Sequence, residues 1–411
     1  MKRHDFILAG GGLAGLSLAY HLIHSPLRDR SILIIDRDAK DRNDRTWCFW
    51  ADQPTPFDDI AYRAWDRLRF VGEDFERVFH LGAYRYRMVR GIDFYRFVLG
   101  ELAARPNVTF VQSAVDRVED GADEARVTVG DRVYAGRWVF DSLLRPSELR
   151  TDPSRYHFLR QHFKGWIIES PRNAFDPRTP TLFDFRTPQN GSMRFVYTLP
   201  LSEHRALIEY TLFSAGVLRR EEYERGLKDY IRSRLGIEEY QIIEEENGII
   251  PMTDRHFPRR AGARVMNVGA KGGRVKPSSG YAFLRIQRDS AAIVESMLKA
   301  GHPFDAPCDS AWYRLHDSIM LNLMSWHGDQ VGRLFAEMFK NNPIERVFRF
   351  LDERGSPLGD VPLLASLPPW PFLRALARAR LLRRIEPPQR GSLGAPRRAR
   401  RESARPGPGA E

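Results

Sequence analysis

The chain has few cysteines and lacks a long uninterrupted apolar run. Cys48 and Cys308 are too few, among 411 residues, for a disulfide framework or a zinc site, which favours a reducing compartment and predicts no metal. The longest apolar stretches are rich in glycine, as in FILAGGGLAGLSLAY, and fall short of the roughly 20 residues of a membrane-spanning helix. We therefore expect a globular protein with ample hydrophobic core.

The body of the chain also lacks the strong basic charge that its composition suggests. The net charge is +11, but residues 371–411 hold eleven arginines, no lysine and three glutamates, which leaves +3 for residues 1–370. Residues 386–411 are rich in Pro, Gly and Arg and are predicted to be a disordered basic tail. Because no aromatic residues interleave with these charges, we expect no nucleic-acid binding.

The order of the expected elements indicates an α/β fold. Residues 5–10 and 31–36 read as buried parallel strands around a helix at 13–24, and 155–213 read as an antiparallel sheet. The expected division is a discontinuous nucleotide-binding domain at 1–150 and 240–300 with substrate-side elements near 45–95, an antiparallel substrate sheet at 151–239, and a helical region at 301–385.

A glycine motif joins the first expected strand to the first helix. Gly10, Gly12 and Gly15 form the GxGxxG pattern, which permits a tight turn and close approach of the backbone to a pyrophosphate at a helix N-terminus. Asp36 ends the second strand, where a carboxylate can accept a hydrogen bond from a ribose hydroxyl. An acid at this position favours FAD or NAD over NADP, and the N-terminal location favours FAD.

A second glycine-rich segment, VMNVGAKGGRVKPSSGYAF, follows another expected strand. Its residues Gly269, Gly272 and Gly280 would let the backbone approach the pyrophosphate and the isoalloxazine. Many flavoproteins carry a Gly-Asp pair here, whereas this chain has alanine at position 270. A surface loop without a ligand is the alternative interpretation.

The run DRTWCFWAD concentrates aromatic residues in one expected strand. A period of two places Trp47 and Phe49 on one face and Cys48 and Trp50 on the other. These side chains either fill a core or line an apolar pocket, with Arg45 near the flavin.

Several stretches together resemble the bacterial lycopene cyclases, flavoproteins that close the ends of linear carotenoids into β-ionone rings. The matching stretches, in the order of the family, are ILAGGGLAGLSLAYHL, DRTWCFW, QHFKGWIIE, TLFDFR, RFVYTLPLS, ALIEYTLFS, NGIIPMT and GGRVKPSSGYAFLRIQRDS. The resemblance implies a Rossmann-like FAD-binding domain of the flavin hydroxylase type, with an antiparallel-sheet substrate domain and a helical C-terminal part.

The resemblance also gives a role to Glu209, an acid in the apolar segment LIEYT. It matches the glutamate that the family uses for acid–base chemistry, whereas alternation alone leaves an outward-facing carboxylate open. Cyclisation of lycopene protonates C2 of a terminal alkene, joins C6 to C1 and removes a proton from C6, without net redox change. The resemblance implies reduced FAD as the cofactor, which stabilises the cation, and NAD(P)H as an external reductant; a role of the flavin in proton transfer stays open.

Other acids and aromatics near this segment are candidates for the site. Asp184 is either a second acid or the salt-bridge partner of Arg186, and we favour the latter. Aromatic faces suit both a polyene and a passing cation. The expected pocket walls, with core packing as the alternative, are Trp47, Phe49, Trp166, Phe195, Tyr197 and Tyr281.

Two other classes of function stay open from the sequence. An FAD-dependent monooxygenase or isoprenoid reductase shares the expected fold, and a flavin- or lipid-binding protein without catalysis is the third hypothesis. Glu209 on a strand and alanine at position 270 favour the cyclase.

The C-terminal segment 363–384, LLASLPPWPFLRALARARLLRR, combines aliphatic residues, a tryptophan and arginines. On a helix, Phe372, Leu376 and Ala379 share a face, although nearby arginines interrupt it. Such a segment fits the surface of an anionic membrane, and we expect peripheral association on the cytoplasmic side. A helix docked on the body of the protein is the alternative.

We predict that deleting residues 386–411 leaves activity in detergent but weakens binding to liposomes, because the basic tail is lost. Co-sedimentation with anionic liposomes measures this effect. Unchanged sedimentation would contradict anchoring by the tail.

Overall fold

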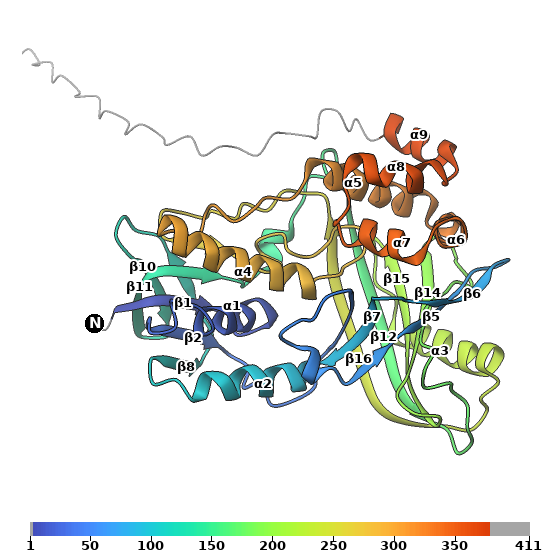
Figure 1. Ribbon diagram of the computed structural model, residues 1–411, viewed down its shortest axis with the longest axis horizontal. Helices are drawn as coiled ribbons and strands as arrows, with labels where there is room; N and C mark the ends of the chain where they lie inside the picture. The colour runs from blue at the N-terminus through green and yellow to red at the C-terminus, as the bar shows by residue number, and fades with distance from the viewer. Residues whose placement is uncertain (1–2, 379–411) are drawn as a thin grey trace, which may run out of the picture.

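The computed structural model describes residues 3–378, and its first sheet has the strand order β8-β2-β1-β11-β10-β9, with β17 beside β11 (Figure 1). Strands β8, β2, β1, β11 and β17 run parallel, whereas β10 runs antiparallel to both of its neighbours, β11 and β9. The strands are β1 (Arg3–Ala9), β2 (Ile32–Asp36), β8 (Val108–Gln112), β9 (Arg117–Glu119), β10 (Ala125–Val129), β11 (Arg132–Asp141) and β17 (Val265–Asn267).

Both faces of β1 and β2 are covered, which explains their continuous apolar sequences. Alternate residues such as Phe6 and Leu8 pack with the helices α1 (Leu13–Ile23), α2 (Gly91–Ala103) and α4 (Phe283–Ala300). The intervening residues, such as Ile7, pack with β10 on the opposite face. This half of the molecule carries the glycine turn at the start of α1 (Figure 1).

The second sheet has the order β16-β12-β15-β14-β13-β5-β6. Its strands are β5 (Arg67–Val71), β6 (Glu76–His80), β12 (Phe158–Glu169), β13 (Thr181–Asp184), β14 (Met193–Pro200), β15 (Arg205–Ser214) and β16 (Gln241–Thr253). One face packs against α3 (Arg220–Leu235), and the other faces the C-terminal helices. The α/β fold with an antiparallel sheet and a helical C-terminal part is therefore confirmed.

The antiparallel sheet does not end at residue 239, where we expected its boundary. Strand β16 pairs with β12 along nearly its whole length and thus belongs to this sheet. Residues 244–246 are three consecutive glutamates, so the segment lacks the alternation by which a strand is predicted.

A three-stranded sheet, β3-β7-β4, connects the two larger ones. Its strands are β3 (Thr46–Ala51), β4 (Arg63–Trp65) and β7 (Arg85–Arg90). Trp47 and Phe49 both contact Phe283, whereas Cys48 and Trp50 pack in the core of the second sheet. The expected two faces of β3 are confirmed.

The helices of the C-terminal part of the chain cover the face of the second sheet that lies opposite α3 (Figure 1). They are α5 (Ala311–His327), α6 (Val331–Asn341), α7 (Ile344–Leu351), α8 (Pro357–Ala365) and α9 (Pro369–Arg378). Between residues 3 and 378, no helix has the length and apolarity to cross a bilayer. The predicted disordered tail, 386–411, lies outside the described residues.

A buried ionic cluster fixes these helices to the loop before α4. The Nζ atom of Lys276 lies 2.8 Å from Asp317 of α5 and 2.7 Å from Glu353, and Arg285 of α4 also pairs with Glu353. Because charges inside a protein are costly unless paired, the cluster requires all its members.

We predict that Lys276→Met destabilises the protein by about 3–5 kcal/mol, because Asp317 and Glu353 lose a buried cation. The midpoint of urea unfolding measures the loss. The control is Lys299→Met, which removes an exposed partner of Glu295 and should change stability by less than about 0.5 kcal/mol. Equal effects of the two changes would contradict the role of the cluster.

Candidate functional site

A cleft with a cavity volume of about 500 Å³ lies where the three sheets meet. Its walls come from the glycine turn, β3, the second sheet and the segment before α4. The lining includes Gly12, Leu13, Ala14, Arg45, Thr46, Trp47, Cys48, Tyr86, Ser142, Gln161, Phe163, Tyr197, Leu207, Glu209, Glu246, Gly269, Ala270, Gly280, Tyr281 and Phe283. One cavity thus joins a nucleotide-type motif to carboxyl groups of the antiparallel sheet.

The glycine turn fits a ligand that approaches the backbone closely. A Cβ atom at Gly15 would lie 1.9 Å from the carbonyl oxygen of Gly10, so this position holds the helix against the turn. A Cβ at Gly12 would meet no described atom within 4 Å, because this residue faces the open cleft. The carboxylate of Asp36 accepts a hydrogen bond from the backbone N–H of Gly11 at 2.6 Å and thus lies beside the turn.

The second glycine-rich segment forms the opposite wall of the cleft. Gly269 and Gly280 line it, and so does Ala270, whereas Gly272 lies in the turn behind. Gln161 lines the same wall, and its buried Oε1 atom has no hydrogen-bond partner among the described residues. An unpaired buried acceptor at a cleft wall fits a ligand with hydrogen-bond donors.

Glu209 projects into the cleft because of its place in the alternation of β15. Ala206, Ile208 and Tyr210 pack toward α3, so that Leu207 and Glu209 face the other way. The hydroxyl of Thr211 donates a hydrogen bond to Glu209 at 2.7 Å. The structure therefore places this carboxyl in the wall of the same cleft as the glycine turn.

A second carboxyl, Glu246, lies beside Glu209 and was not predicted. Gly165 of β12 pairs with Glu209 of β15 on one side and with Glu246 of β16 on the other. The hydroxyl of Thr46 donates a hydrogen bond to Glu246 at 2.8 Å. The signal in the sequence was a glutamate triplet next to an apolar run, which does not tell which of the three faces inward.

Burial controls the protonation of both acids. Burial in the cleft, together with the neighbouring Glu246, raises the pKa of Glu209 well above its ordinary value, and the hydrogen bond from Thr211 opposes this shift. Burial also raises the pKa of Glu246, against the lowering effect of hydrogen bonds to Thr46 and Glu209. The cleft therefore holds a protonated carboxyl at a pH where an exposed glutamate is ionised.

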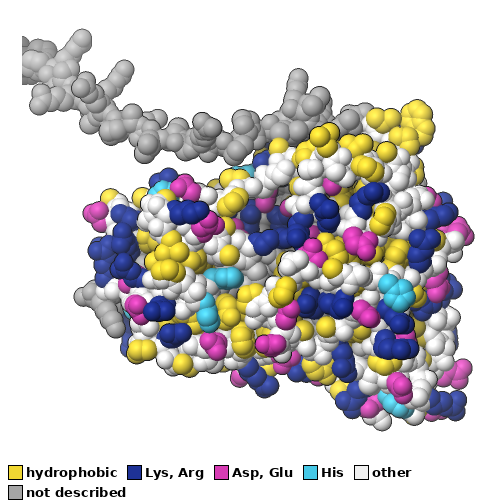
Figure 2. Space-filling view, viewed as in Figure 1, with side chains coloured by type: hydrophobic (Ala, Val, Ile, Leu, Met, Phe, Trp, Pro, Cys, Tyr) yellow, Lys and Arg dark blue, Asp and Glu magenta, His cyan; other side chains and the backbone are white. Residues whose placement is uncertain are grey.

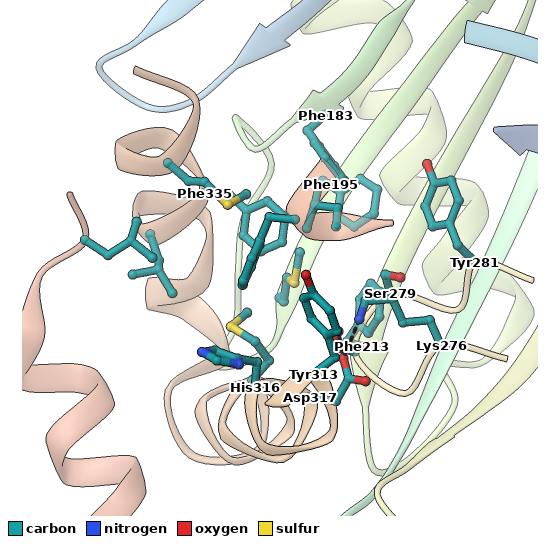
Figure 3. Close-up of a pocket in the computed structure, with 18 of the residues that line it drawn as sticks. Phe183, Phe195, Phe213, Lys276, Ser279, Tyr281, Tyr313, His316, Asp317 and Phe335 are labelled. Carbon is teal, nitrogen blue, oxygen red and sulfur yellow. Dashed lines mark hydrogen bonds and ion pairs between the residues drawn. The ribbon is translucent and has the colours of Figure 1, made fainter. Parts of the chain in front are cut away.

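Aromatic side chains wall the cleft and an adjoining apolar cavity of about 70 Å³. Tyr197 and Tyr281 line both spaces, Trp47 lines only the cleft, and Phe195 lines only the apolar cavity. Figure 3 shows Phe183, Phe195 and Phe335 on one side of this cavity and Tyr313 and His316 on another. Tyr197 and Tyr281 thus belong to the walls of both spaces.

Three expected site residues lie elsewhere. Trp166 packs in the core under α3, because its position in β12 points away from the cleft. Asp184 is buried and paired with Arg186 at 2.7 Å, and it accepts a hydrogen bond from Tyr230 at 2.9 Å. Phe49 stacks on Phe283 and lies behind the wall of the cleft. The prediction of Trp166 as a pocket wall is therefore wrong, and Asp184 has a structural partner, as we favoured.

Arg45 lies at the cleft, where we expected it near a ligand. Its guanidinium pairs with Asp44 at 2.8 Å and remains about half exposed, with 54% of the side chain accessible. It is thus available to an anionic group at the mouth of the cleft.

Solved structures with a similar fold are flavoproteins. The flavoprotein/dehydrogenase of Cytophaga hutchinsonii has a TM-score of 0.60 at 13% identity, over 85% of this chain and 92% of that one. HpxO of Klebsiella pneumoniae, solved as a complex with FAD, has a TM-score of 0.58 at 15% identity, over 89% and 99%. The fold is therefore of the type found in FAD-dependent monooxygenases and reductases.

Within this class, the chain belongs to the lycopene cyclase family. The family model described as lycopene cyclase protein matches residues 5–377. The chain is 26% identical over 384 residues to the lycopene beta-cyclase of Pseudescherichia vulneris, which covers 90% of this chain and 95% of that protein. It is 25% identical over 390 residues to that of Pantoea ananas, over 91% and 97%. The resemblance seen in the sequence is confirmed.

We predict that Glu209→Gln raises the melting temperature at pH 8 and that the gain shrinks toward pH 5. A raised pKa in the folded state means that the stability contributed by Glu209 is complete below the ordinary glutamate pKa and is lost as pH rises toward the folded value. Glutamine does not titrate, so the variant should gain about 2 °C or more at pH 8. Thermal unfolding at equal flavin content measures this; a gain that does not depend on pH would contradict it.

Proposed function

We propose that this chain is a lycopene cyclase that closes the linear ψ-ends of lycopene into β-rings by acid catalysis, with reduced FAD. The observation that carries the proposal is the single cleft that holds both the glycine turn and Glu209, a carboxyl whose pKa is raised well above its ordinary value by burial. Its relatives named lycopene beta-cyclase, aligned over most of both chains, support it.

Glu209 is the proton donor in this proposal. An alkene is a weak base, so the reaction needs an acid that stays protonated in a dry cavity, and burial of Glu209 meets that need. Exclusion of water by the aromatic walls also prevents capture of the cation as an alcohol. The charge moves from C1 to C5 as C6 joins C1, and loss of the C6 proton completes the ring.

The cleft fits FAD by its glycine turn, the unpaired Gln161 Oε1 and the carboxylate beside the turn. Gly12 and the N-terminus of α1 would hold the pyrophosphate, and Asp36 would bind the ribose. Gly269 and Gly280 would lie along the isoalloxazine side. Reduced FAD would supply a fixed negative charge that stabilises the passing cation, with NAD(P)H as its external reductant.

The polyene would lie between the cleft and the apolar cavity. A hydrocarbon offers no hydrogen-bonding group, so shape and apolar contact must hold it. The apolar cavity extends from Tyr197 and Tyr281 toward Leu364, Leu367 and Phe372 of the C-terminal helices. This direction leads from the carboxyl to the end of the molecule formed by α8 and α9.

That end also carries the apolar surface that a membrane-bound substrate requires. Leu358, Val361, Trp370 and Leu373 of α8 and α9 are exposed, and Figure 2 shows hydrophobic side chains gathered over this end. Phe372, one of the three residues of the expected helix face, lines the cavity. The side chains of the other two, Leu376 and Ala379, lie outside the described residues. The arginine-rich segment follows directly, which suits an anionic bilayer and peripheral association on the cytoplasmic side.

An FAD-dependent monooxygenase or isoprenoid reductase is the alternative on this fold. Its test is anaerobic incubation of the flavin-loaded protein with lycopene and dithionite. Ring products without consumption of NADPH support the cyclase, whereas a need for oxygen or for stoichiometric NADPH supports the alternative.

In the same assay, we predict that Glu209→Gln binds flavin normally but loses cyclisation by 10²-fold or more, because the variant lacks the group that donates the proton. The absorbance of bound flavin and the yield of ring products measure the two properties. The control is Glu238→Gln, an exposed glutamate between α3 and β16, which should behave like the wild type. Near-normal activity of Glu209→Gln would remove it from the mechanism.

We also predict that the double substitution Trp370→Ser and Leu373→Ser lowers binding to anionic liposomes, because it removes apolar area from the exposed end of α9. Activity with detergent-dispersed lycopene should be retained. Liposome flotation measures binding, and the matched control is Val78→Ser, an exposed apolar residue on β6. Equal flotation of all three proteins would exclude this surface from membrane contact.

A further inference from the structure

We propose that Glu209 and Glu246 form a carboxyl pair that holds one proton, in which Glu209 protonates C2 of the substrate and Glu246 receives the proton from C6. The inference rests on the proposed cyclase function and adds a second reacting group to it.

The sheet places the two carboxyls together. Glu209 and Glu246 are not on neighbouring strands but flank Gly165 of β12, on the same face of the sheet. Two strand spacings separate their backbones by roughly 10 Å, which two glutamate side chains can span. The side chain of Glu246 raises the pKa of Glu209, and that of Glu209 lowers the pKa of Glu246, as expected for two carboxyls within reach of each other across Gly165.

Gly165 makes this contact possible. A Cβ atom at this position would lie 3.0 Å from the Cγ atom of Glu246 and 3.4 Å from its Oε1 atom. The space above the central strand is thus filled by the side chain of Glu246, which crosses the glycine toward Glu209. A residue with a side chain here would separate the two acids.

The surroundings of the pair do not supply a counter-charge. The groups that shift the two carboxyls are each other, Glu244 and the hydroxyls of Thr46 and Thr211, and none of these described residues is a cation. The other titratable groups at the pair are Cys48 of β3, Tyr197 of β14 and Tyr281, with Tyr86 of β7 behind Cys48. Burial raises the pKa of all four, so they stay neutral at physiological pH.

Two carboxylates in contact without a cation cannot both ionise, and one proton remains between them. Neutral Glu209 then donates its hydrogen bond to ionised Glu246, which the hydroxyl of Thr46 also stabilises. The cleft thus presents an acid and a base to the same substrate at the same time.

This arrangement matches the proton balance of the reaction. Glu209 gives its proton to C2 and becomes a carboxylate, while the C1 cation forms. The C5–C6 electron pair makes the C1–C6 bond, and Glu246 takes the proton that C6 releases as the new double bond forms. Transfer of this proton from Glu246 back to Glu209 through their hydrogen bond restores the starting state, with no net gain or loss of protons.

Infrared spectroscopy of the flavin-loaded wild type tests the pair without any turnover. We expect the carbonyl band of a protonated carboxyl to persist at pH 8, to vanish in Glu209→Gln and to shift in Glu246→Gln. The control Glu238→Gln, at an exposed glutamate that does not act on the pair, should keep the wild-type band. A wild-type protein with no such band at pH 8 would overturn the one-proton pair. This measurement needs no substrate, so its result tests the carboxyl pair alone. A wild-type protein that shows the band but does not cyclise lycopene would count against the proposed function and not against the pair.

Cyclisation assays test the role of Glu246 as a base. We expect Glu246→Gln to bind flavin normally, to lose 10²–10⁴-fold in rate, and to lose its remaining activity at a lower pH than the wild type, because Glu209 no longer has a negative neighbour. Glu246→Asp should recover part of the rate. A wild-type rate and pH profile in Glu246→Gln, or a lowered rate with an unshifted profile, would overturn the assignment.

Discussion

The proposed reaction depends on one constraint, which is that a carboxyl group must remain protonated inside a cavity that also admits a cofactor. Burial satisfies it by disfavouring the ionised form of Glu209. Glu209 is buried because the second sheet, the three-stranded sheet and the C-terminal helices together exclude water from one side of β15. Stability is sacrificed for this, since a buried acid without a cation opposes folding as pH rises.

The two halves of the molecule contribute different parts of the cleft. The parallel sheet ends in a turn whose backbone is open at Gly12, a geometry made for a ligand with phosphate groups. The antiparallel sheet offers long, regular strands, on which side chains alternate between α3 and the cleft. Strand β3 completes the wall and also supplies Thr46 to Glu246, so that the insertion serves the carboxyls as well as the core.

Local features allowed much of this to be predicted from the sequence. The glycine turn follows from the spacing of a few neighbouring residues. Alternation left an outward-facing Glu209 open, and the resemblance to the family decided for the inward face. Glu246 is different, because its partner is 37 residues away and its own strand hides among three glutamates. Trp166 was misplaced for a related reason: an aromatic residue looks the same in sequence on either face of a buried strand, and only the pairing of β12 decides which face it takes.

The glycine at position 165 shows why such a pair escapes pattern reading. Its role is to leave a space, and that space is used by side chains from the strands on both sides. In an isolated strand this glycine would only reduce β propensity. In the assembled sheet it lets two acids approach each other over the backbone, at the point where the cleft is walled by aromatic rings. In the proposed reaction, the hydrocarbon substrate cannot be oriented by hydrogen bonds, so its reacting carbons would have to be set by shape against a fixed acid and a fixed base. A rigid central strand with one missing side chain meets that requirement better than a loop would, because both carboxyls are then held by the same hydrogen-bonded ladder.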